Sequence, residues 1–199
     1  MNGGCRREFF DKEARGWDER YHENDEQEIR RLASRLDLRP GDRVLDLGTG
    51  NGVLLPSLLE KTKDGKKILA VDFSWNMICE AARTGAKDGI CFINASVEAL
   101  PFKDRTMDCV TCLGTFAHVC DKREAIGEMS RVLRRSGRLY IAHLMGKEKL
   151  AEHHRSAGGA VKNDVLPPDR EMAAMMKRAG LKKVHIIDRP DLYLASARR

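Results

Sequence analysis

The sequence predicts an α/β protein with a Rossmann-like three-layer sandwich, in which helices cover both faces of a seven-stranded, mostly parallel sheet. Three observations favour this fold class. Short apolar runs alternate with helical segments along most of the chain. The first apolar run ends in a glycine-rich turn, Gly48–Gly52, which is typical of the ligand-binding edge of such a sheet. The last two apolar runs flank Pro190 and resemble a hairpin, which predicts one antiparallel strand.

The chain has 199 residues, of which 42% are hydrophobic and 33% are charged, as expected for one domain over residues 1–199. Apolar runs predict strands near residues 43–47, 67–72, 91–94, 108–113, 138–143, 183–188 and 192–197. Periodic segments predict helices near 8–36, 52–62, 74–84, 121–134, 147–155 and 169–179. Asp121 and Glu124 have the spacing of a capping box.

Two segments lie outside this alternation. We expect residues 1–36 to form a helical lid, with Trp17 and Tyr21 as its aromatic residues, although these side chains serve equally well to anchor a helix to the body. Residues 146–168 form a connection of more than 20 residues, and connections of that length are often functional. We therefore expect residues 146–168 to cover a substrate.

The glycine turn itself indicates the charge of its ligand. Its spacing is G-x-G-x-G, and Val53 stands where the dinucleotide-binding fingerprint has a third glycine. Asp46 precedes the first glycine by two residues, and a carboxylate at that place repels a pyrophosphate but attracts a cation. The turn therefore favours a cationic ligand without phosphate, a description that S-adenosylmethionine fits.

A second acid, Asp72, ends the next apolar run some twenty residues later. This is the distance at which an acidic residue in a strand–helix–strand unit reaches the ribose hydroxyls of an adenosine. Capping of the following helix is the alternative role, but Ser74 stands in the better N-cap position. We therefore expect Asp72 to bind ribose.

The glycine turn and Asp72, together with segments 91–102, 108–119 and 128–141, resemble the motifs of class I S-adenosylmethionine-dependent methyltransferases of the type 11 group, which includes quinone-biosynthesis C-methyltransferases. The resemblance spans roughly residues 40–145. It implies S-adenosylmethionine as the cofactor. Ser96 replaces the family acid that accepts the adenine amine, so that contact is expected to be weaker. The implied cofactor-binding residues are Asp46, Gly48, Thr49, Gly50, Asp72, Phe73, Ser96, Val97, Leu113 and Trp17.

Methyl transfer from a sulfonium is an in-line displacement that depends mainly on alignment and on exclusion of water. A base is needed only when the acceptor must lose a proton. His118 and His143 follow the fourth and fifth expected strands and are the candidate catalytic residues, while His153, His154 and Tyr21 are candidate substrate contacts. For any one of these histidines the ordinary alternative is a polar residue that lines a pocket.

The sequence does not predict a metal site, because ligand spacings such as H-x-x-x-H are absent. Cys109 and Cys112 form a C-x-x-C pattern, but residues three apart in a strand point to opposite faces and do not easily bind one metal. We therefore expect both cysteines to pack in the core.

The predicted function is S-adenosylmethionine-dependent methyl transfer to a small molecule. An RNA or protein methyltransferase, or a non-catalytic S-adenosylmethionine-binding regulator, are the alternatives. The net charge of +6 permits nucleic acid, but aromatic residues do not interleave with the basic clusters, so nucleic acid is not favoured. Neither an apolar stretch of about 20 residues nor a signal core is present. We expect a cytoplasmic monomer or homodimer without a membrane span.

Overall fold

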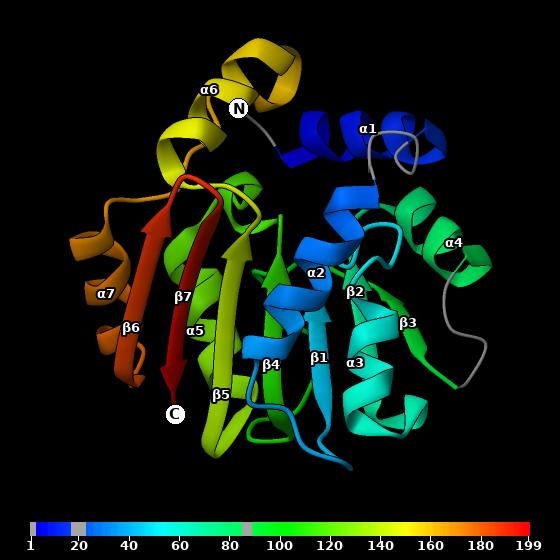
Figure 1. The fold of residues 1–199 in the computed structure, drawn as a ribbon, viewed down its shortest axis with the longest axis vertical. Coiled ribbons are helices and arrows are strands. Elements are labelled where there is room, and N and C mark those ends of the chain that lie inside the picture. The colour runs from blue at the N-terminus through cyan, green and yellow to red at the C-terminus, as the bar shows by residue number, and fades with distance from the viewer. Residues whose placement is uncertain (1–2, 17–22, 85–88) are drawn as a thin grey trace.

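A computed structural model describes residues 3–16, 23–84 and 89–199 (Figure 1). The sheet has the strand order β3-β2-β1-β4-β5-β7-β6. β7 runs antiparallel to both of its neighbours, and the other pairs are parallel. The predicted fold class is therefore confirmed. The strands are β1 (Val44–Leu47), β2 (Ile68–Asp72), β3 (Cys91–Asn94), β4 (Met107–Leu113), β5 (Leu133–His143), β6 (Lys182–Arg189) and β7 (Leu192–Arg198).

Helices precede and connect these strands. The α-helices are α1 (Gly3–Glu13), α2 (Glu23–Arg35), α3 (Leu55–Thr62), α4 (Trp75–Thr84), α5 (Lys122–Val132), α6 (Lys147–Ala157) and α7 (Asp169–Arg178). Short 3-10 turns occur at η1 (Ala14–Gly16), η3 (Gly65–Lys67), η4 (Phe116–His118) and η5 (Gly159–Val161). Within the described ranges, no helix is long and apolar enough to cross a membrane.

The core lies on both faces of the sheet because side chains alternate along each strand. Val44 and Cys109 pack with α2 and α3 on one face. Leu45 and Cys112 pack with α5 and α7 on the other face. Cys109 and Cys112 therefore point to opposite sides and are buried in separate clusters, which confirms their predicted role in core packing.

Two helix starts follow the predicted caps. The Asp121 carboxylate accepts hydrogen bonds from the backbone N–H groups of Arg123 and Glu124, at 3.0 and 2.9 Å. The Ser74 hydroxyl accepts one from the Met77 N–H at 3.2 Å. Each cap gives a partner to N–H groups that the first helical turn leaves unpaired.

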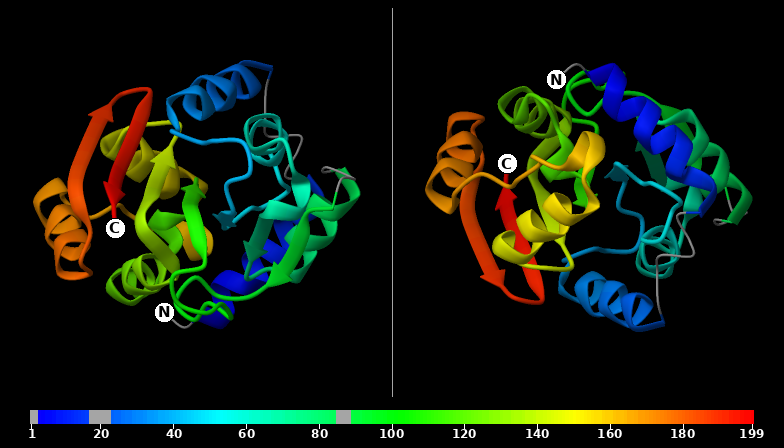
Figure 2. Two further views of the ribbon diagram at one scale, coloured as in Figure 1. Left: turned by 90° about the horizontal axis from the view of Figure 1, so that it is seen from below. Right: turned by 90° about the horizontal axis from the view of Figure 1, so that it is seen from above.

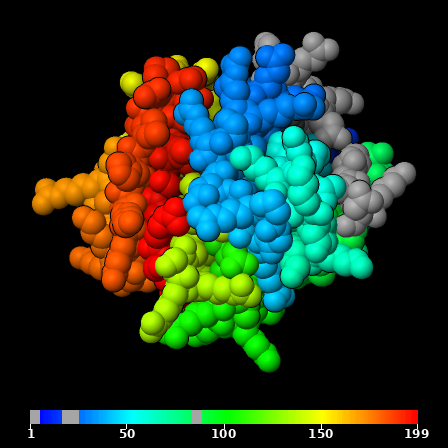
Figure 3. All heavy atoms as spheres, turned by 60° about the horizontal axis from the view of Figure 1, so that its bottom comes forward, coloured from blue at the N-terminus to red at the C-terminus, as the bar shows by residue number. Residues whose placement is uncertain are grey.

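The predicted continuous helix over residues 8–36 is wrong. α1 ends at Glu13, η1 ends at Gly16, and α2 begins at Glu23. A glycine inside a helix costs about 1 kcal/mol relative to alanine, which disfavours an α-helix that continues through Gly16. α1 and α6 lie over the carboxyl ends of the parallel strands (Figures 1 and 2), whereas α2 lies between the C-terminal strands and α3 on the face shown in Figure 3. Leu32 of α2 packs there against Leu192 and Leu194.

The predicted boundary between the helix over 121–134 and the strand over 138–143 is also wrong. The structure ends α5 at Val132 and begins β5 at Leu133. Leu133 is fully buried and pairs with Met107 of β4, and Arg134 forms an ion pair with Asp108 at 2.9 Å. These contacts to β4 extend the strand where local periodicity favours helix.

Candidate cofactor and substrate cavities

The turn after β1 needs its glycines for two different reasons. Gly48 and Gly50 have φ values of +64° and +55°, in the left-handed region that favours glycine. A Cβ atom added to Gly48 would overlap the side chain of Thr115, whose hydroxyl donates a hydrogen bond to the Gly48 carbonyl at 3.0 Å. A Cβ atom added to Gly50 would meet no atom within 4 Å. The lack of a side chain at Gly48 therefore allows Thr115 to pack closely against the turn. The lack of a side chain at Gly50 leaves the space beside it open.

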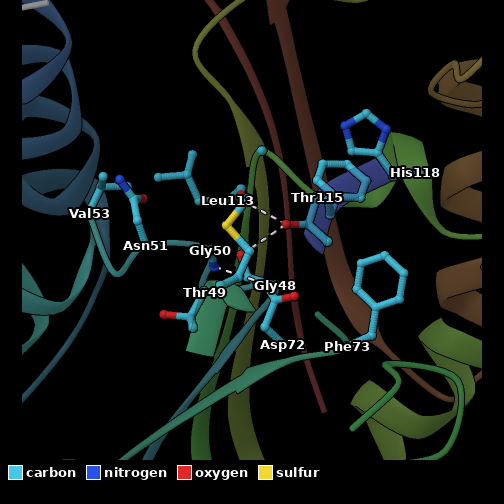
Figure 4. Close-up of a pocket in the computed structure, with 13 residues that line it drawn as sticks. Gly48, Thr49, Gly50, Asn51, Val53, Asp72, Phe73, Leu113, Thr115 and His118 are labelled. Atoms are coloured by element: carbon cyan, nitrogen blue, oxygen red, sulfur yellow. Dashed lines mark hydrogen bonds between the residues drawn. The ribbon is translucent and has the colours of Figure 1, made fainter. Parts of the chain in front are cut away.

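A cavity of about 560 Å³ lies beside this turn, at the carboxyl ends of β1, β2 and β4 (Figure 4). The structure brings six of the predicted cofactor residues to its wall, namely Gly48, Thr49, Gly50, Asp72, Phe73 and Leu113. The wall also contains His118, which the sequence indicated as a candidate catalytic residue. The wall residues that the sequence did not indicate are Phe10, Asn51, Val53, Met77, Gly114 and Thr115. Among the described residues, no lysine or arginine lines this cavity.

Asp72 stands at the end of β2 and is 6% exposed. One carboxylate oxygen accepts a hydrogen bond from the Gly50 N–H at 2.9 Å, and the other accepts one from the Ser74 N–H at 2.9 Å. Burial raises the pKa of Asp72 to about 6, against these hydrogen bonds. Each oxygen has a second lone pair, so the carboxylate is able to accept two hydroxyl groups from a ligand.

Asp46 lies beneath the turn rather than in the cavity wall. It is 2% exposed, and its carboxylate accepts a hydrogen bond from the Thr111 hydroxyl at 2.8 Å. Burial, together with the negative charge of Asp72, raises its pKa to about 6. Both acids are therefore mainly ionised at pH 7, which makes this end of the cavity favourable for a cation and unfavourable for a phosphate.

Besides Asp46, four predicted cofactor or substrate residues are not placed in a cavity wall. Ser96 does not line the cavity, and its hydroxyl donates a hydrogen bond to Glu98. Val97 is 9% exposed and packs in the core. Trp17 and Tyr21 lie outside the described residues. The adenine contact expected from Ser96 and Val97 stays a prediction.

A second, larger cavity of about 1220 Å³ lies between α1, α6 and the ends of β4 and β5. It shares four wall residues with the first cavity, which are Phe10, Leu113, Gly114 and His118. The rest of its wall is mainly apolar, and among the described residues neither lysine nor arginine contributes to it. The two cavities therefore adjoin at a common boundary.

All four candidate histidines line the larger cavity. Nδ1 of His118 lies 2.8 Å from a carboxylate oxygen of Asp164. Nδ1 of His154 donates to the Asp164 carbonyl at 2.6 Å, and His153 is exposed beside it. His143 is 2% exposed, and burial lowers its pKa to about 3, so its ring is neutral at pH 7. The nearby His118 and His154 contribute to this lowering of the pKa.

Helix α1 supplies contacts that sequence reasoning did not assign. The Phe10 ring contacts the Phe73 ring of the smaller cavity and the His118 ring of the boundary, with its centroid 5.7 Å from that of Phe73 and 5.1 Å from that of His118. Arg7 donates a hydrogen bond to the Phe73 carbonyl at 2.8 Å. The aromatic pair Phe9–Phe10 was visible in the sequence, but its partners lie more than 60 positions further along the chain.

The comparisons with known proteins agree with this geometry. Residues 45–141 match the family model described as a methyltransferase domain. Residues 45–141, just under half of the chain, thus belong to the methyltransferase domain family. Its matching segment is the one that carries the glycine turn, Asp72 and His118, and S-adenosylmethionine is the cofactor of this family. The predicted resemblance to the type 11 group is confirmed.

Relatives of this methyltransferase domain act on different molecules. The chain is 40% identical over 113 residues to the demethylmenaquinone methyltransferase of Corynebacterium urealyticum, a match covering 57% of this chain and 46% of that protein. It is 32% identical over 162 residues to the 27-O-demethylrifamycin SV methyltransferase of Amycolatopsis mediterranei, covering 76% of this chain and 58% of the relative. The chain thus spans about half the length of the curated relatives that it matches.

Solved structures show the same fold. A methyltransferase of Haloferax volcanii, solved in a complex with the activator Trm112, has a TM-score of 0.78 and 21% identity, and the match covers 95% of this chain and 96% of that chain. An S-adenosylmethionine-dependent methyltransferase of Thermotoga maritima has a TM-score of 0.67 and 19% identity, covering 87% and 88%. At these identities the likeness supports the fold alone.

Proposed function

We propose that this methyltransferase domain binds S-adenosylmethionine in the smaller cavity and transfers its methyl group to a small molecule in the larger cavity. The observation that carries the proposal is the common boundary of the two cavities, formed by Phe10, Leu113, Gly114 and His118. A donor in the first cavity and an acceptor in the second are next to each other across this boundary. Alignment of the two reacting atoms is the main requirement of the reaction.

The residues of the smaller cavity fit this cofactor. Asp72 is placed to accept the two ribose hydroxyls, and the negative charge of Asp46 favours the cationic part of the ligand. Phe73 and Leu113 offer apolar surface to the adenine. The turn brings the backbone of Gly48, Thr49 and Gly50 close enough to contact the cofactor. The lack of lysine and arginine among the described wall residues argues against a dinucleotide.

A small, largely apolar acceptor suits the larger cavity better than nucleic acid. Its wall includes Leu144, Met145, Leu150 and Val161, and its described residues provide no cation for a phosphate backbone. His143 is buried, and its Nε2 makes no hydrogen bond to any described residue. It is thus free to bind a polar group of the acceptor. His153 and His154 lie on the same wall as further substrate contacts.

S-adenosylmethionine, when bound, supplies a methyl group activated by a positively charged sulfur. The chain contributes alignment, exclusion of water and, for an acceptor that must lose a proton, a base. Of the two candidate catalytic histidines, we assign the base to His118, because it lies at the cavity boundary. His143, with a pKa of about 3, is a weak base and is assigned to substrate binding.

The test is methyl transfer into a low-molecular-mass metabolite fraction. Purified protein is incubated with methyl-labelled S-adenosylmethionine and that fraction, with and without nuclease, and release of S-adenosylhomocysteine is measured. The proposal requires release that survives nuclease treatment and falls strongly in Asp72→Asn but not in Asp104→Asn, which alters an exposed ion pair with Arg131. A nuclease-sensitive signal would assign RNA as the acceptor, and cofactor binding without release from any pool would indicate a regulator.

A further inference from the structure

Asp164 connects three separate parts of the chain at the boundary of the two cavities. It follows η5, and its side chain is 1% exposed. Its carboxylate contacts His118 of η4 at 2.8 Å and accepts hydrogen bonds from the guanidinium of Arg6 in α1, one of them at 3.2 Å from Nε. Its backbone carbonyl accepts a hydrogen bond from His154 of α6 at 2.6 Å.

The ionisation state of Asp164 decides how His118 is protonated. Burial opposes the charged carboxylate, but hydrogen bonds from His118 and Arg6 outweigh burial and lower the pKa of Asp164 to about 2. An ionised carboxylate only accepts hydrogen bonds. Nδ1 of His118 must therefore carry the hydrogen, and in the neutral ring the lone pair is on Nε2.

This nitrogen is available to a ligand. Nδ1 of His118 is taken by Asp164, and within the described part of the chain Nε2 has no hydrogen-bond partner. The ring is a wall of both cavities. It contacts the Phe10 ring and the His154 ring, with centroids at 5.1 and 4.7 Å. These ring contacts restrict its rotation.

Other titratable groups face the same cluster from neighbouring elements. His154 of α6 and His143 of β5 are both kept neutral at pH 7, because burial lowers the pKa of each. Lys122 of α5 donates to the carbonyls of Ala117 and Val119 at 3.1 and 2.9 Å. Cys120 accepts a hydrogen bond from Arg6 at 3.0 Å. The charged side chains described here around His118 are therefore those of Asp164, Arg6 and Lys122.

We propose that Asp164, clamped by Arg6, is a positioning residue that fixes His118 as the Nδ1–H tautomer and presents its unprotonated Nε2 to the methyl acceptor. This inference rests on the proposed function. In the step, the bond between the acceptor atom and its hydrogen breaks, and the proton moves to Nε2. The released electron pair forms the new bond to the methyl carbon, and the electrons of the broken carbon–sulfur bond stay on sulfur.

Imidazole nitrogen NMR tests this tautomer without any substrate. Uniformly ¹⁵N-labelled protein is recorded at pH 8, where long-range proton–nitrogen spectra distinguish the two neutral tautomers, and the His118 signals are assigned by their loss in His118→Gln. We expect a protonated Nδ1 in the wild type and in Asp104→Asn. In Asp164→Ala the hydrogen moves to Nε2, the form that a free imidazole side chain prefers.

A wild-type His118 with its hydrogen on Nε2 would overturn the inference, and this result does not depend on whether a variant folds. A folded Asp164→Ala protein that keeps Nδ1 protonated would overturn it as well. The same samples are titrated with S-adenosylhomocysteine. If the wild-type protein binds S-adenosylhomocysteine but His118 carries its hydrogen on Nε2, the positioning role of Asp164 is refuted and the proposed function is unaffected. If His118 carries its hydrogen on Nδ1 but the protein does not bind S-adenosylhomocysteine, the proposed function is refuted, and the assignment of His118 as the base is refuted with it.

Discussion

The Gly50 backbone N–H donates a hydrogen bond to the Asp72 carboxylate at 2.9 Å, which ties the turn after β1 to the end of β2. The second carboxylate oxygen accepts from the Ser74 N–H, so the acid also organises the start of α4. Asp72 thus holds two neighbouring loops while one edge of its side chain lines the smaller cavity. The first prediction follows from this double role.

Asp72→Asn is expected to weaken binding of S-adenosylhomocysteine by about 10- to 100-fold, since hydrogen bonds to a charged group contribute about 1.5–3 kcal/mol. The amide keeps the shape but has only one oxygen to accept hydrogen bonds. Titration calorimetry measures the change, and Asp104→Asn is the matched control at an exposed ion pair. Equal affinity of Asp72→Asn and wild type would show that Asp72 does not bind the ribose.

Asp46 makes stability fall as pH rises. Its pKa is 3.8 in a model peptide and is raised to about 6 by burial in the folded protein. A raised pKa means that folding favours the protonated acid, so this stabilisation is present below about pH 4 and is lost as pH rises through 6. The unfolding free energy of Asp46→Asn relative to wild type should therefore increase by about 2–3 kcal/mol between pH 4 and pH 7.5.

Urea unfolding at several pH values measures this difference for Asp46→Asn. Asp104→Asn again serves as the control, since its carboxylate is exposed and pairs with Arg131. A difference that stays flat across the same pH range would mean that Asp46 is not held in a desolvated site. The buried negative charge of Asp46 is unfavourable for folding, and a bound cationic ligand would offset it.

Replacing Gly48 or Gly50 with alanine is expected to have different effects on stability and on ligand binding. Gly48→Ala should lower stability by about 2–4 kcal/mol, because strain from the positive φ adds to overlap with Thr115. Gly50→Ala should cost about 1 kcal/mol from φ alone, while weakening binding of S-adenosylhomocysteine. Gly41→Ala is the control for backbone strain. Gly41 has a φ of +81°, a Cβ atom added to it would meet no atom within 4 Å, and it lies outside the cavity wall.

Chemical unfolding and calorimetry on these three variants separate packing from ligand contact. Equal stability losses for Gly48→Ala and Gly41→Ala would contradict the close approach of Thr115 to the turn. Unchanged ligand affinity of Gly50→Ala would contradict a ligand against that glycine.

The two strand cysteines are expected to resist alkylation in the native protein. Cys109 and Cys112 are buried, and burial raises the pKa of each thiol far above its usual value. Cys79 and Cys91 are exposed and should react first. Mass spectrometry after brief treatment with iodoacetamide gives the order, and labelling of Cys112 as fast as Cys79 would contradict the core packing of β4.

The sheet and the cofactor edge were predictable because their signals are local. The apolar run before Gly48 and the acid at Asp72 each report their own strand end. The boundary at Leu133 was not predictable, since its pairing with Met107 is a long-range contact.

The histidine site was only partly predictable for the same reason. His118 was identified from its place after a strand, and Asp164 lay in a segment expected to cover the substrate. Their contact joins positions 46 apart, and Arg6 is 158 positions from Asp164. The periodicity of these segments does not predict the contacts of Asp164 with His118 and Arg6. It arises from the way α1 and η5 pack over the sheet edge.

The central claim is that the smaller cavity receives a cationic, phosphate-free adenosine ligand. Titration calorimetry of the wild-type protein with S-adenosylhomocysteine and, separately, with NADH tests it most directly. We expect saturable heat at one site per chain for S-adenosylhomocysteine and none for NADH. Saturable heat for NADH with none for S-adenosylhomocysteine would contradict the account.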